Sequence, residues 1–261
     1  MNINDNESGN HMKIAITDYD GTLKPLKSEV PKSNIEAIQR WRKAGNKFGI
    51  ATGRNINLLE FELKNYDITL DFAICVNGAV IFDKNKNILH SVKIPPSIIK
   101  DFIELPMVKD VDNEMIVCCE WKIFSIRPYA EMPVELIPEI KLNEAAQLKD
   151  AVQFGIKFKT ADEALNAAAE LNKIFPMLNG NPNRNYLDIN MRGVDKKYGI
   201  EKLIEIMDWT DNQILVIGDD SNDLPMIKHF NGFTVKTAAP FMHEAAVKVY
   251  NSVGDMLDNL N

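Results

Sequence analysis

The stretch that most constrains what this chain can fold into is residues 13–23, KIAITDYDGTL. Its apolar and β-branched first half is typical of a strand buried on both faces, as in a parallel sheet. Asp18 and Asp20 are two residues apart, so in extended geometry both leave the strand's carboxyl end on one side, and Gly21 lets the backbone turn after them. Two carboxylates this close repel unless a divalent cation neutralises them. We therefore expect a hard-metal site at the end of a central parallel strand.

Length and composition limit the protein class. The 261 residues allow one or two domains, and the hydrophobic (45%) and charged (26%) fractions are ordinary for a soluble globular protein. A net charge of −7 argues against a nucleic-acid partner, and no apolar run approaches the roughly 20 residues of a membrane span. Residues 1–11 are polar and lack a secretory signal, so we interpret them as a disordered tail or an expression remnant and expect a cytoplasmic protein. The cysteines lie in apolar runs and are expected to be reduced core residues: Cys75, Cys118 and Cys119.

Short apolar segments alternate with helical patterns over much of the chain. The segments expected to be strands end in polar residues and cover positions 13–17, 47–51, 72–76 and 213–217. Helical spacing follows at about 31–44, after Asn55 and at 197–207. This alternation predicts an α/β fold with a Rossmann-like doubly wound parallel sheet, in which ligands bind outside the carboxyl ends of the strands.

The alternation is lost between residues 83 and 188. We expect this segment to form an inserted α+β cap domain, with strands near 115–121, 122–127, 153–159 and 186–190 and a helix at 161–174. The core domain would then consist of residues 12–82 and 189–261.

Each polar motif has an ordinary structural explanation when taken alone. Asp18-Tyr19-Asp20-Gly21 and Asn77-Gly78 could each form a hairpin turn, and Thr52-Gly53-Arg54 could form a strand-to-helix turn. Lys196-Lys197 could be a solvated pair at a helix start, and Asp219, Asp220 and Asp223 could cap a helix. Their placement carries more information than any single motif. All fall at strand ends or helix starts, which this type of sheet collects on one edge.

This ordered set resembles the haloacid dehalogenase superfamily of phosphotransferases, from about Met12 to the end of the chain. The inserted segment between the threonine and lysine motifs resembles the class IIB cap of the Cof-type subfamily, whose members are mostly sugar-phosphate and related small-phosphate phosphatases. The matching segments are ATGR at 51–54, VNGA at 76–79 and GDDSND at 218–223. The resemblance implies Mg²⁺ as cofactor and a small phosphorylated metabolite as substrate.

The resemblance also implies a role for each matching residue. Asp18 would attack phosphorus and become an aspartyl phosphate, and Asp20 would protonate the leaving alcohol and then activate water. Asp18, the backbone carbonyl of Asp20 and Asp219 would hold Mg²⁺. The implied supporting groups are Asp223 and Asn222 near the metal, Thr52 and Lys196 on the phosphoryl group, and Gly53, Asn77 and Gly78 in the same pocket.

Physical chemistry agrees with these roles. Phosphoryl transfer needs groups that place the reactants in line and offset charge on the phosphoryl oxygens, which a lysine, a hydroxyl and Mg²⁺ can do. Asp20 must hold a proton near neutral pH, so we expect it to be partly buried. Lys197 stands where the family has a glycine, which leaves it a candidate beside Lys196. Tyr19 replaces a common aliphatic residue and is expected either to pack or to line the entrance.

The expected function is that of a Mg²⁺-dependent phosphatase acting through an aspartyl phosphate. Two alternatives stay open: a phosphomutase of the phosphomannomutase type, and a slow-turnover phosphoacceptor or phosphate-binding module. Asp20 argues against the module, which would not need a second carboxylate for proton transfer. Four cations could either contact a second charged group of the substrate or simply be solvated: Arg127, Lys157, Arg184 and Arg192.

Overall fold

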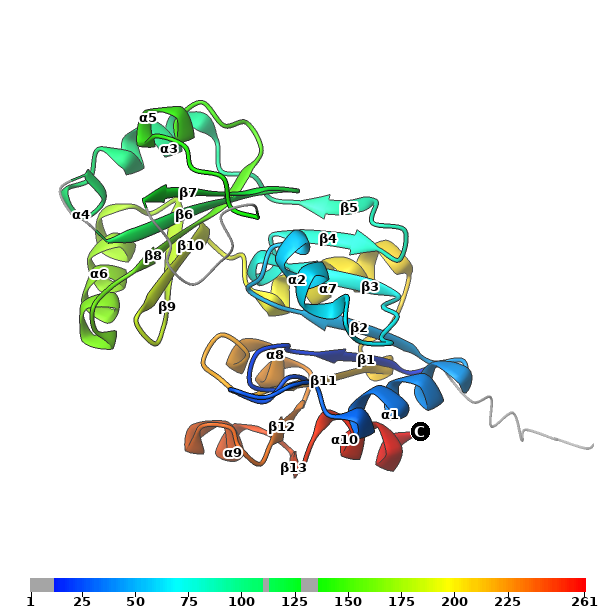
Figure 1. Ribbon diagram of the computed structural model, residues 1–261. Coiled ribbons are helices and arrows are strands. Elements are labelled where there is room, and N and C mark those ends of the chain that lie inside the picture. The colour runs from blue at the N-terminus through cyan, green and yellow to red at the C-terminus, as the bar shows by residue number, and fades with distance from the viewer. Residues whose placement is uncertain (1–11, 110–112, 128–135) are drawn as a thin grey trace, which may run out of the picture.

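The computed structural model of the protein describes residues 12–109, 113–127 and 136–261. This part of the chain forms a parallel-dominated sheet and a separate antiparallel sheet, each with its own helices (Figure 1). The fold is therefore the expected α/β core with an α+β insertion. The predicted tail at residues 1–11 lies outside the described residues.

The elements around the larger sheet are, in chain order, β1 (Ile14–Thr17), α1 (Lys32–Lys43), β2 (Lys47–Ala51), α2 (Ile56–Leu63), β3 (Phe72–Cys75), the 3-10 turn η1 (Val76–Gly78), β4 (Val80–Asp83), β5 (Ile88–Ser91), α7 (Lys196–Met207), the 3-10 turn η2 (Asp211–Gln213), β11 (Ile214–Gly218), α8 (Leu224–His229), β12 (Phe233–Val235), α9 (Pro240–Ala245), β13 (Lys248–Tyr250) and α10 (Val253–Leu260). Those around the smaller sheet are α3 (Pro96–Ile103), α4 (Pro106–Lys109), β6 (Glu114–Cys119), β7 (Ile123–Arg127), α5 (Leu142–Ala145), β8 (Ala151–Lys157), α6 (Ala161–Ile174), β9 (Leu178–Asn183) and β10 (Tyr186–Met191).

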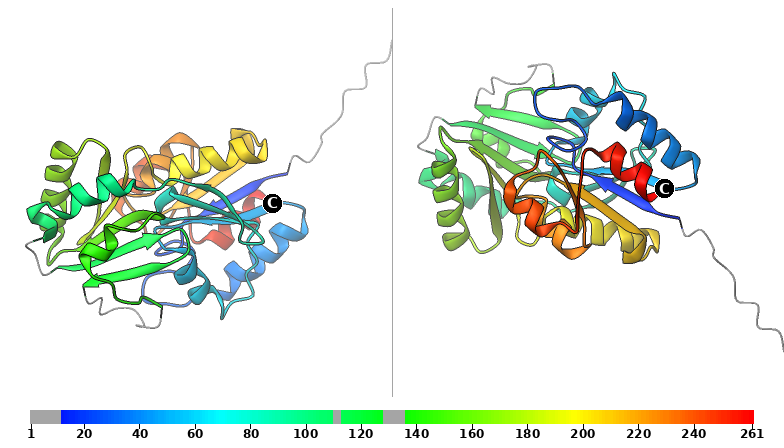
Figure 2. Two further views of the ribbon diagram at one scale, coloured as in Figure 1. Left: turned by 90° about the horizontal axis from the view of Figure 1, so that it is seen from above. Right: turned by 90° about the horizontal axis from the view of Figure 1, so that it is seen from below.

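The larger sheet has the strand order β13-β12-β11-β1-β2-β3-β4-β5, with β4 and β5 antiparallel to their neighbours. The strand β1 lies between β11 and β2, where Ile16 is opposite Val216 and Gly49. Helices cover both faces: α1 packs against α10 on one, and α7 packs with α8 on the other (Figures 1 and 2). Because β1 is central and covered on both sides, Asp18 directly after it lies in the middle of the sheet's carboxyl edge.

The smaller sheet is the cap, with the antiparallel order β7-β6-β8-β10-β9. The predicted helix α6 lies against it and buries Ala164, Ala167, Ala168 and Leu171. The views from above and below place this cap beyond the carboxyl ends of the core strands (Figure 2). The two sheets therefore enclose the edge at which ligands bind in this type of fold.

Some elements differ from the expectation. The core sheet continues beyond residue 82, because β5 pairs with β4 and ends at Ser91, while the cap sheet runs to Met191. The strand β9 has the sequence LNGNPN, without β-branched or aromatic residues, and its place at the edge of the sheet tolerates Pro182. Among the helices in the described ranges, none combines the length and apolarity needed to cross a membrane.

Candidate active site

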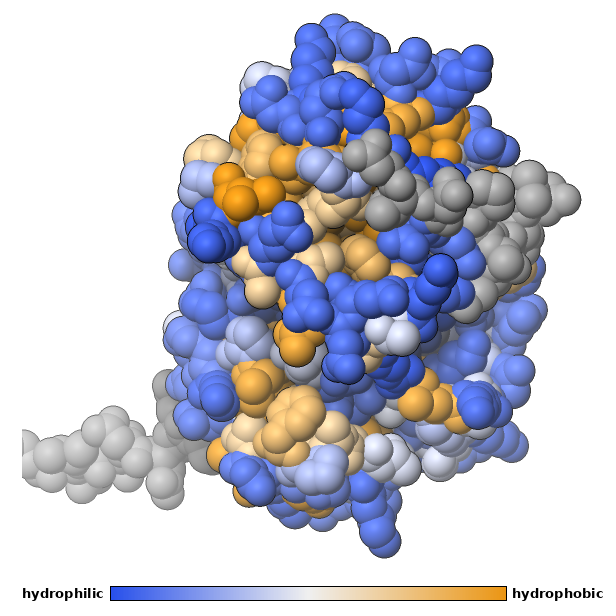
Figure 3. Space-filling view, turned by 90° about the vertical axis from the view of Figure 1, so that its left-hand side faces the viewer, coloured by the Kyte–Doolittle hydropathy of each residue, from blue (hydrophilic) through white to orange (hydrophobic). Residues whose placement is uncertain are grey.

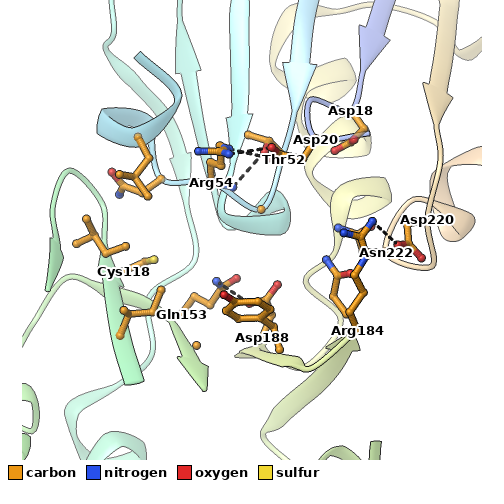
Figure 4. A pocket seen from close by; sticks show the side chains of 18 of the residues that line it. Asp18, Asp20, Thr52, Arg54, Cys118, Gln153, Arg184, Asp188, Asp220 and Asn222 are labelled. Carbon is orange, nitrogen blue, oxygen red and sulfur yellow. Dashed lines mark hydrogen bonds and ion pairs between the residues drawn. The ribbon is translucent and has the colours of Figure 1, made fainter. Parts of the chain in front are cut away.

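The carboxyl edge of the core sheet and the cap enclose a cavity of about 340 Å³ (Figure 4). The core side of the cavity contains predicted site residues that follow three strands: Asp18 and Asp20 after β1, Thr52 and Gly53 after β2, and Asp219 and Asn222 after β11. Figure 3 views the molecule from the left of Figure 1 and shows mostly hydrophilic residues across the middle of this face, between the cap above and the core below. The motifs expected to meet at one sheet edge do meet there.

The two adjacent lysines at the start of α7 point to different places. Lys196 is 1% exposed, and its Nζ lies 2.6 Å from Asp18 Oδ1 and 2.6 Å from Asp223 Oδ1. Lys197 instead pairs with Glu201 at 2.8 Å on the helix surface. Of the two candidates, Lys196 is thus the lysine beside the predicted nucleophile.

Burial and charge work against each other around Lys196. Burial lowers the pKa of its ammonium, but the carboxylates of Asp18 and Asp223 outweigh burial, so the pKa lies above the ordinary value. Burial raises the pKa of Asp18 well above its ordinary value. Lys196 opposes this shift, while Asp223 and Asp219 add to it. The single ammonium of Lys196 is thus outnumbered by the buried carboxyl groups of Asp18, Asp219 and Asp223.

The loop after β1 is shaped to admit Asp219. Gly21 has a φ of 98°, in the left-handed region, and a Cβ on it would lie 2.2 Å from Asp219 Oδ2. Thr22 Oγ1 donates a hydrogen bond of 2.6 Å to Asp219 Oδ1. The Asp-Gly-Thr sequence therefore does not form a hairpin, because β1 pairs in parallel with both neighbours and the following turn wraps around Asp219.

Three carboxylates form a group suited to a metal ion. Asp18, Asp219 and Asp223 each offer one oxygen, and these oxygens lie within 4.8 Å of one another. Buried, hard oxygen donors in excess over one ammonium are the donor set that Mg²⁺ prefers, so the residues fit the ion. Asp223 is already engaged, since its Oδ1 accepts from Lys196 and its Oδ2 from the backbone N–H groups of Asp219 and Asp220. Asp18 and Asp219 are thus the freer ligands, and metal binding by the backbone carbonyl of Asp20 stays a prediction.

The expected partial burial of Asp20 is wrong. Its side chain is 46% exposed, because the chain turns away from the sheet there, with the N–H of Gly21 donating to the carbonyl of Lys24 at 2.8 Å. Both Asp20 oxygens accept from the guanidinium of Arg54, from Nε at 2.6 Å and Nη2 at 2.8 Å (Figure 4). A planar fork of this kind fixes the direction of a carboxyl group. Arg54 was expected in a strand-to-helix turn or in the matching ATGR segment, without a contact to Asp20.

Other side chains hold Arg54 in place. Its Nη1 lies 3.4 Å from Glu62 Oε1, and its guanidinium carbon lies 5.4 Å from the centre of the Tyr19 ring. Tyr19 is fully buried and its hydroxyl donates to Glu62 Oε2 at 3.4 Å. Of the two roles expected for Tyr19, the structure thus shows packing, with Arg54 as its neighbour.

The strands β3 and β4 form a hairpin, as one interpretation of Asn77-Gly78 expected, but the loop has four residues, 76–79, rather than two, and it carries backbone strain. Val76, Asn77 and Gly78 all have positive φ, at 53°, 52° and 97°, which is an outlier for a β-branched valine. A Cβ on Gly78 would lie 2.0 Å from the backbone oxygen of Asp195, so this glycine allows α7 to approach the turn. Phosphate binding by Gly78 stays a prediction.

Asn77 connects the core site to the cap. Its Nδ2 donates to Gln153 Oε1 at 3.1 Å and to Asp188 Oδ2 at 2.9 Å, while its Oδ1 accepts from Asn222 Nδ2 at 3.4 Å. A Cβ on Gly53 would lie 3.3 Å from the same oxygen. Asn77 therefore lies beside Gly53 and Asn222 as predicted, and its amide bonds two cap residues that the sequence analysis did not single out.

Thr52 follows β2 and is 1% exposed at the cavity. Its hydroxyl oxygen accepts from the backbone N–H of Arg54 at 3.1 Å. The hydroxyl proton is left free to donate, so Thr52 can bind a phosphoryl oxygen without losing this contact.

Of the four cations considered for the substrate, Arg184 lies at the cavity. It is at the tip of the β9–β10 hairpin with a φ of 55°, and its Nη2 lies 3.6 Å from Asp220 Oδ2 (Figure 4). The other three make contacts elsewhere: Arg127 with the backbone oxygen of Asn113, Lys157 with Glu114, and Arg192 with the backbone oxygens of Pro176 and Asn172.

Comparison with known proteins identifies the family. A family model for haloacid dehalogenase-like hydrolases matches residues 15–255, so the chain belongs to this family, as its motifs indicated. It is 23% identical to the 5-amino-6-(5-phospho-D-ribitylamino)uracil phosphatase of Bacillus subtilis, over 90% of this chain and 88% of that protein. It is 25% identical to the pyridoxal phosphate phosphatase of Escherichia coli, over 83% and 84%. Among solved structures, a subclass IIB sugar phosphatase of the superfamily superposes with a TM-score of 0.77 at 24% identity, over 95% of this chain and 98% of that one.

Proposed function

We propose that this protein is a Mg²⁺-dependent phosphatase that hydrolyses a small phosphorylated metabolite through an aspartyl phosphate on Asp18. The observation that carries the proposal is the buried Asp18 carboxylate, held 2.6 Å from Lys196 at the wall of a cavity of about 340 Å³. The named relatives act on a ribitylamino-uracil phosphate, pyridoxal phosphate and a sugar phosphate, which supports a small phosphomonoester as substrate. The three buried free cysteines suit the cytoplasm, where we place the enzyme.

In the first step, Asp18 attacks phosphorus as the bond between phosphorus and the leaving oxygen breaks. Asp20, protonated at the start of the cycle, donates its proton to that oxygen. Arg54 then binds both oxygens of the resulting Asp20 carboxylate, as in the structure, and keeps it directed at the cavity until it takes a proton from water. Lys196 and Thr52 bind the equatorial oxygens, where negative charge accumulates.

In the second step, Asp20 takes a proton from water, and the resulting hydroxide attacks the phosphorus of the aspartyl phosphate. The bond to Asp18 breaks, which releases inorganic phosphate and restores both carboxyl groups. Bound Mg²⁺, held by Asp18 and Asp219, would supply the positive charge that lets a carboxylate approach a phosphate dianion.

The test is release of inorganic phosphate from p-nitrophenyl phosphate with Mg²⁺, for the wild type and for Asp18→Asn. The variant keeps the shape of the side chain but removes the nucleophile, so we expect kcat to fall at least about 10⁴-fold. A chelator should abolish the wild-type activity, and added Mg²⁺ should restore it.

Asp162→Asn is the control, because it makes the same change in an exposed first-turn residue of α6 and should leave kcat within about twofold. Retained activity in Asp18→Asn would contradict the proposal. Isomerisation of a hexose phosphate without phosphate release would instead support the phosphomutase. Phosphorylation of Asp18 without multiple turnovers would instead support a slow-turnover phosphoacceptor.

A further inference from the structure

The cap side of the cavity holds a carboxyl group and an amide that point toward the core. Asp188 comes from β10 and Gln153 from the neighbouring antiparallel strand β8 (Figure 4). Gln153 Nε2 donates to Asp188 Oδ1 at 3.4 Å, so the two side chains form one polar unit on the cap. Neither takes part in the proposed chemical steps.

The hydrogen-bond donors that contact Asp188 are neutral amides. It accepts from Asn77 Nδ2 and Gln153 Nε2, and no Lys, Arg or His of the described ranges forms an ion pair with it. Burial raises the pKa of Asp188 to about 6, and the hydrogen bond from Asn77 and the more distant charge of Lys196 only partly oppose this shift. A shielded carboxylate without an ion-pair partner is costly, and in a cleft this arrangement is typical of a group that binds a ligand.

The position of Asp188 indicates which part of the substrate it faces. It is one hydrogen bond from Asn77, whose other side contacts Asn222 and Gly53 of the phosphate-binding edge. The strained turn at Val76–Gly78 holds Asn77 in this place. A carboxylate directed at the phosphoryl group itself would repel it, whereas the leaving group can offer hydrogen-bond donors to it.

Part of the cap wall is apolar, while the β9–β10 hairpin adds Asn183, Arg184 and Tyr186 to the lining. Ile116 and Cys118 of β6 and Ile123 of β7 line the cavity, together with Leu58 of α2 from the core. Such a wall has no hydrogen bonds to offer, and it favours the carbon face of a ring or chain. The cap side of the cavity therefore combines an apolar area with hydrogen-bonding groups, among which are Asp188 and Gln153.

We propose that Asp188 and Gln153 bind the leaving group of the substrate, and that this leaving group carries amino or hydroxyl donors beside an apolar carbon face. The inference rests on the proposed phosphatase function. Asp188 accepts hydrogen bonds from the donors, and Gln153 orients its carboxylate. An amino group is favoured over a hydroxyl group because its positive charge supplies the missing counter-ion.

The experiment compares wild type and Asp188→Asn on a panel of phosphomonoesters under steady-state conditions. Glucosamine 6-phosphate, glucose 6-phosphate and erythritol 4-phosphate carry donors, and p-nitrophenyl phosphate has none on its leaving group. We expect the wild type to prefer at least one donor-bearing ester, by kcat/KM, over p-nitrophenyl phosphate. We expect the variant to lose at least about tenfold in kcat/KM on that ester, mainly through KM, and less than twofold on p-nitrophenyl phosphate.

The outcomes separate this inference from the proposed function. A wild type that hydrolyses no ester contradicts the phosphatase itself. A wild type that prefers p-nitrophenyl phosphate to every donor-bearing ester, or a variant that loses equally on all esters, overturns the role of Asp188 and leaves the phosphatase in place. Asp162→Asn is again the matched carboxylate-to-amide control on the cap, and its substrate preference should equal that of the wild type.

Discussion

Asp18 on the core and Asp188 on the cap both line the same cavity, but their surroundings differ. Asp18 lies 2.6 Å from the buried ammonium of Lys196, which also pairs with Asp223. Asp188 has the amides of Asn77 and Gln153 and no cation in ion-pair contact among the described residues. Burial raises the pKa of both carboxyl groups.

The difference reflects what each side of the cavity has to do. The core edge holds its charged groups in fixed contacts before substrate arrives, as preorganised electrostatic catalysis requires. The cap leaves its carboxylate with only neutral partners, so a donor on the substrate can still improve its environment. In the proposed mechanism, chemistry and recognition are thus built on different sheets, and we expect a change to one to leave the other intact.

Removing the ammonium of Lys196 should have the largest effect, because it should lower both the stability and the activity of the protein. Lys196→Met leaves two buried carboxylates without their ammonium, so we expect the free energy of unfolding at pH 7 to fall by about 3–5 kcal/mol. Because the pKa of Lys196 is raised, its contribution is fully present below the unfolded pKa and is lost only as the pH rises through the folded pKa, above the ordinary value. Phosphatase activity should be lost with it.

Lys197→Met is the control, since Lys197 is a partly exposed neighbour that pairs with Glu201. It should cost no more than about 0.5 kcal/mol in denaturant unfolding and leave kcat within about twofold. Equal losses in the two variants would remove the distinction between the fixed ion pairs of the core edge and an ordinary surface pair.

Arg54→Lys tests the positioning of Asp20. The lysine keeps the positive charge but cannot form the two-point contact with both Asp20 oxygens, so we expect kcat to fall by about 10- to 100-fold with little change in KM. Steady-state kinetics with p-nitrophenyl phosphate measures both parameters.

The matched control is Arg40→Lys, because Arg40 makes a similar fork with Asp258, at 2.7 Å for the shortest contact, far from the cavity. This variant should keep the wild-type kcat. If Arg54→Lys also kept it, Arg54 would have no part in directing Asp20.

Asp188→Asn should change the free energy of unfolding less than Lys196→Met does, and in the opposite direction. The raised pKa of about 6 means that ionised Asp188 is disfavoured in the folded protein, so its cost develops as the pH rises from about 4 to 6 and is complete above that range. We expect the variant to be more stable than the wild type at pH 8, by on the order of 1–2 kcal/mol, and equally stable at pH 4.

Denaturant unfolding at both pH values measures this difference, with Asp162→Asn as the same change in an exposed residue of the cap. A variant that is less stable than the wild type at pH 8 would mean that Asp188 already has a sufficient partner in the free protein. The contrast between the two carboxylates would then be lost.

Much of the core could be predicted from local patterns. The strand that contains Ile14–Thr17, the helix α6 and the Asn55 cap of α2 all appear where periodicity and capping residues indicated. These elements follow short-range rules, because burial on one or two faces imposes its period on consecutive residues. The strand β9 has no such pattern, since its sequence LNGNPN becomes a strand only through pairing with β10.

The candidate site divides in the same way. Asp18, Thr52, Asp219 and a lysine at 196 or 197 were predictable, because they follow strands or begin a helix on an edge that parallel topology brings together. The contact of Arg54 with Asp20 was not, because the two residues are 34 positions apart and no local pattern reports the exposure of Asp20. The contact between Asp188 and Asn77 was not predictable either, because the two residues are 111 positions apart in the sequence.

The stretch KIAITDYDGTL and its companion motifs thus specified the sheet, the edge that lines the cavity and the carboxylates suited to a metal, because each depends on residues close together in the chain. The direction of Asp20, the choice of Lys196 over Lys197 and the carboxylate of the cap arose only in the folded molecule. They depend on which side chains separate segments bring within hydrogen-bond distance, and on how much water those segments exclude.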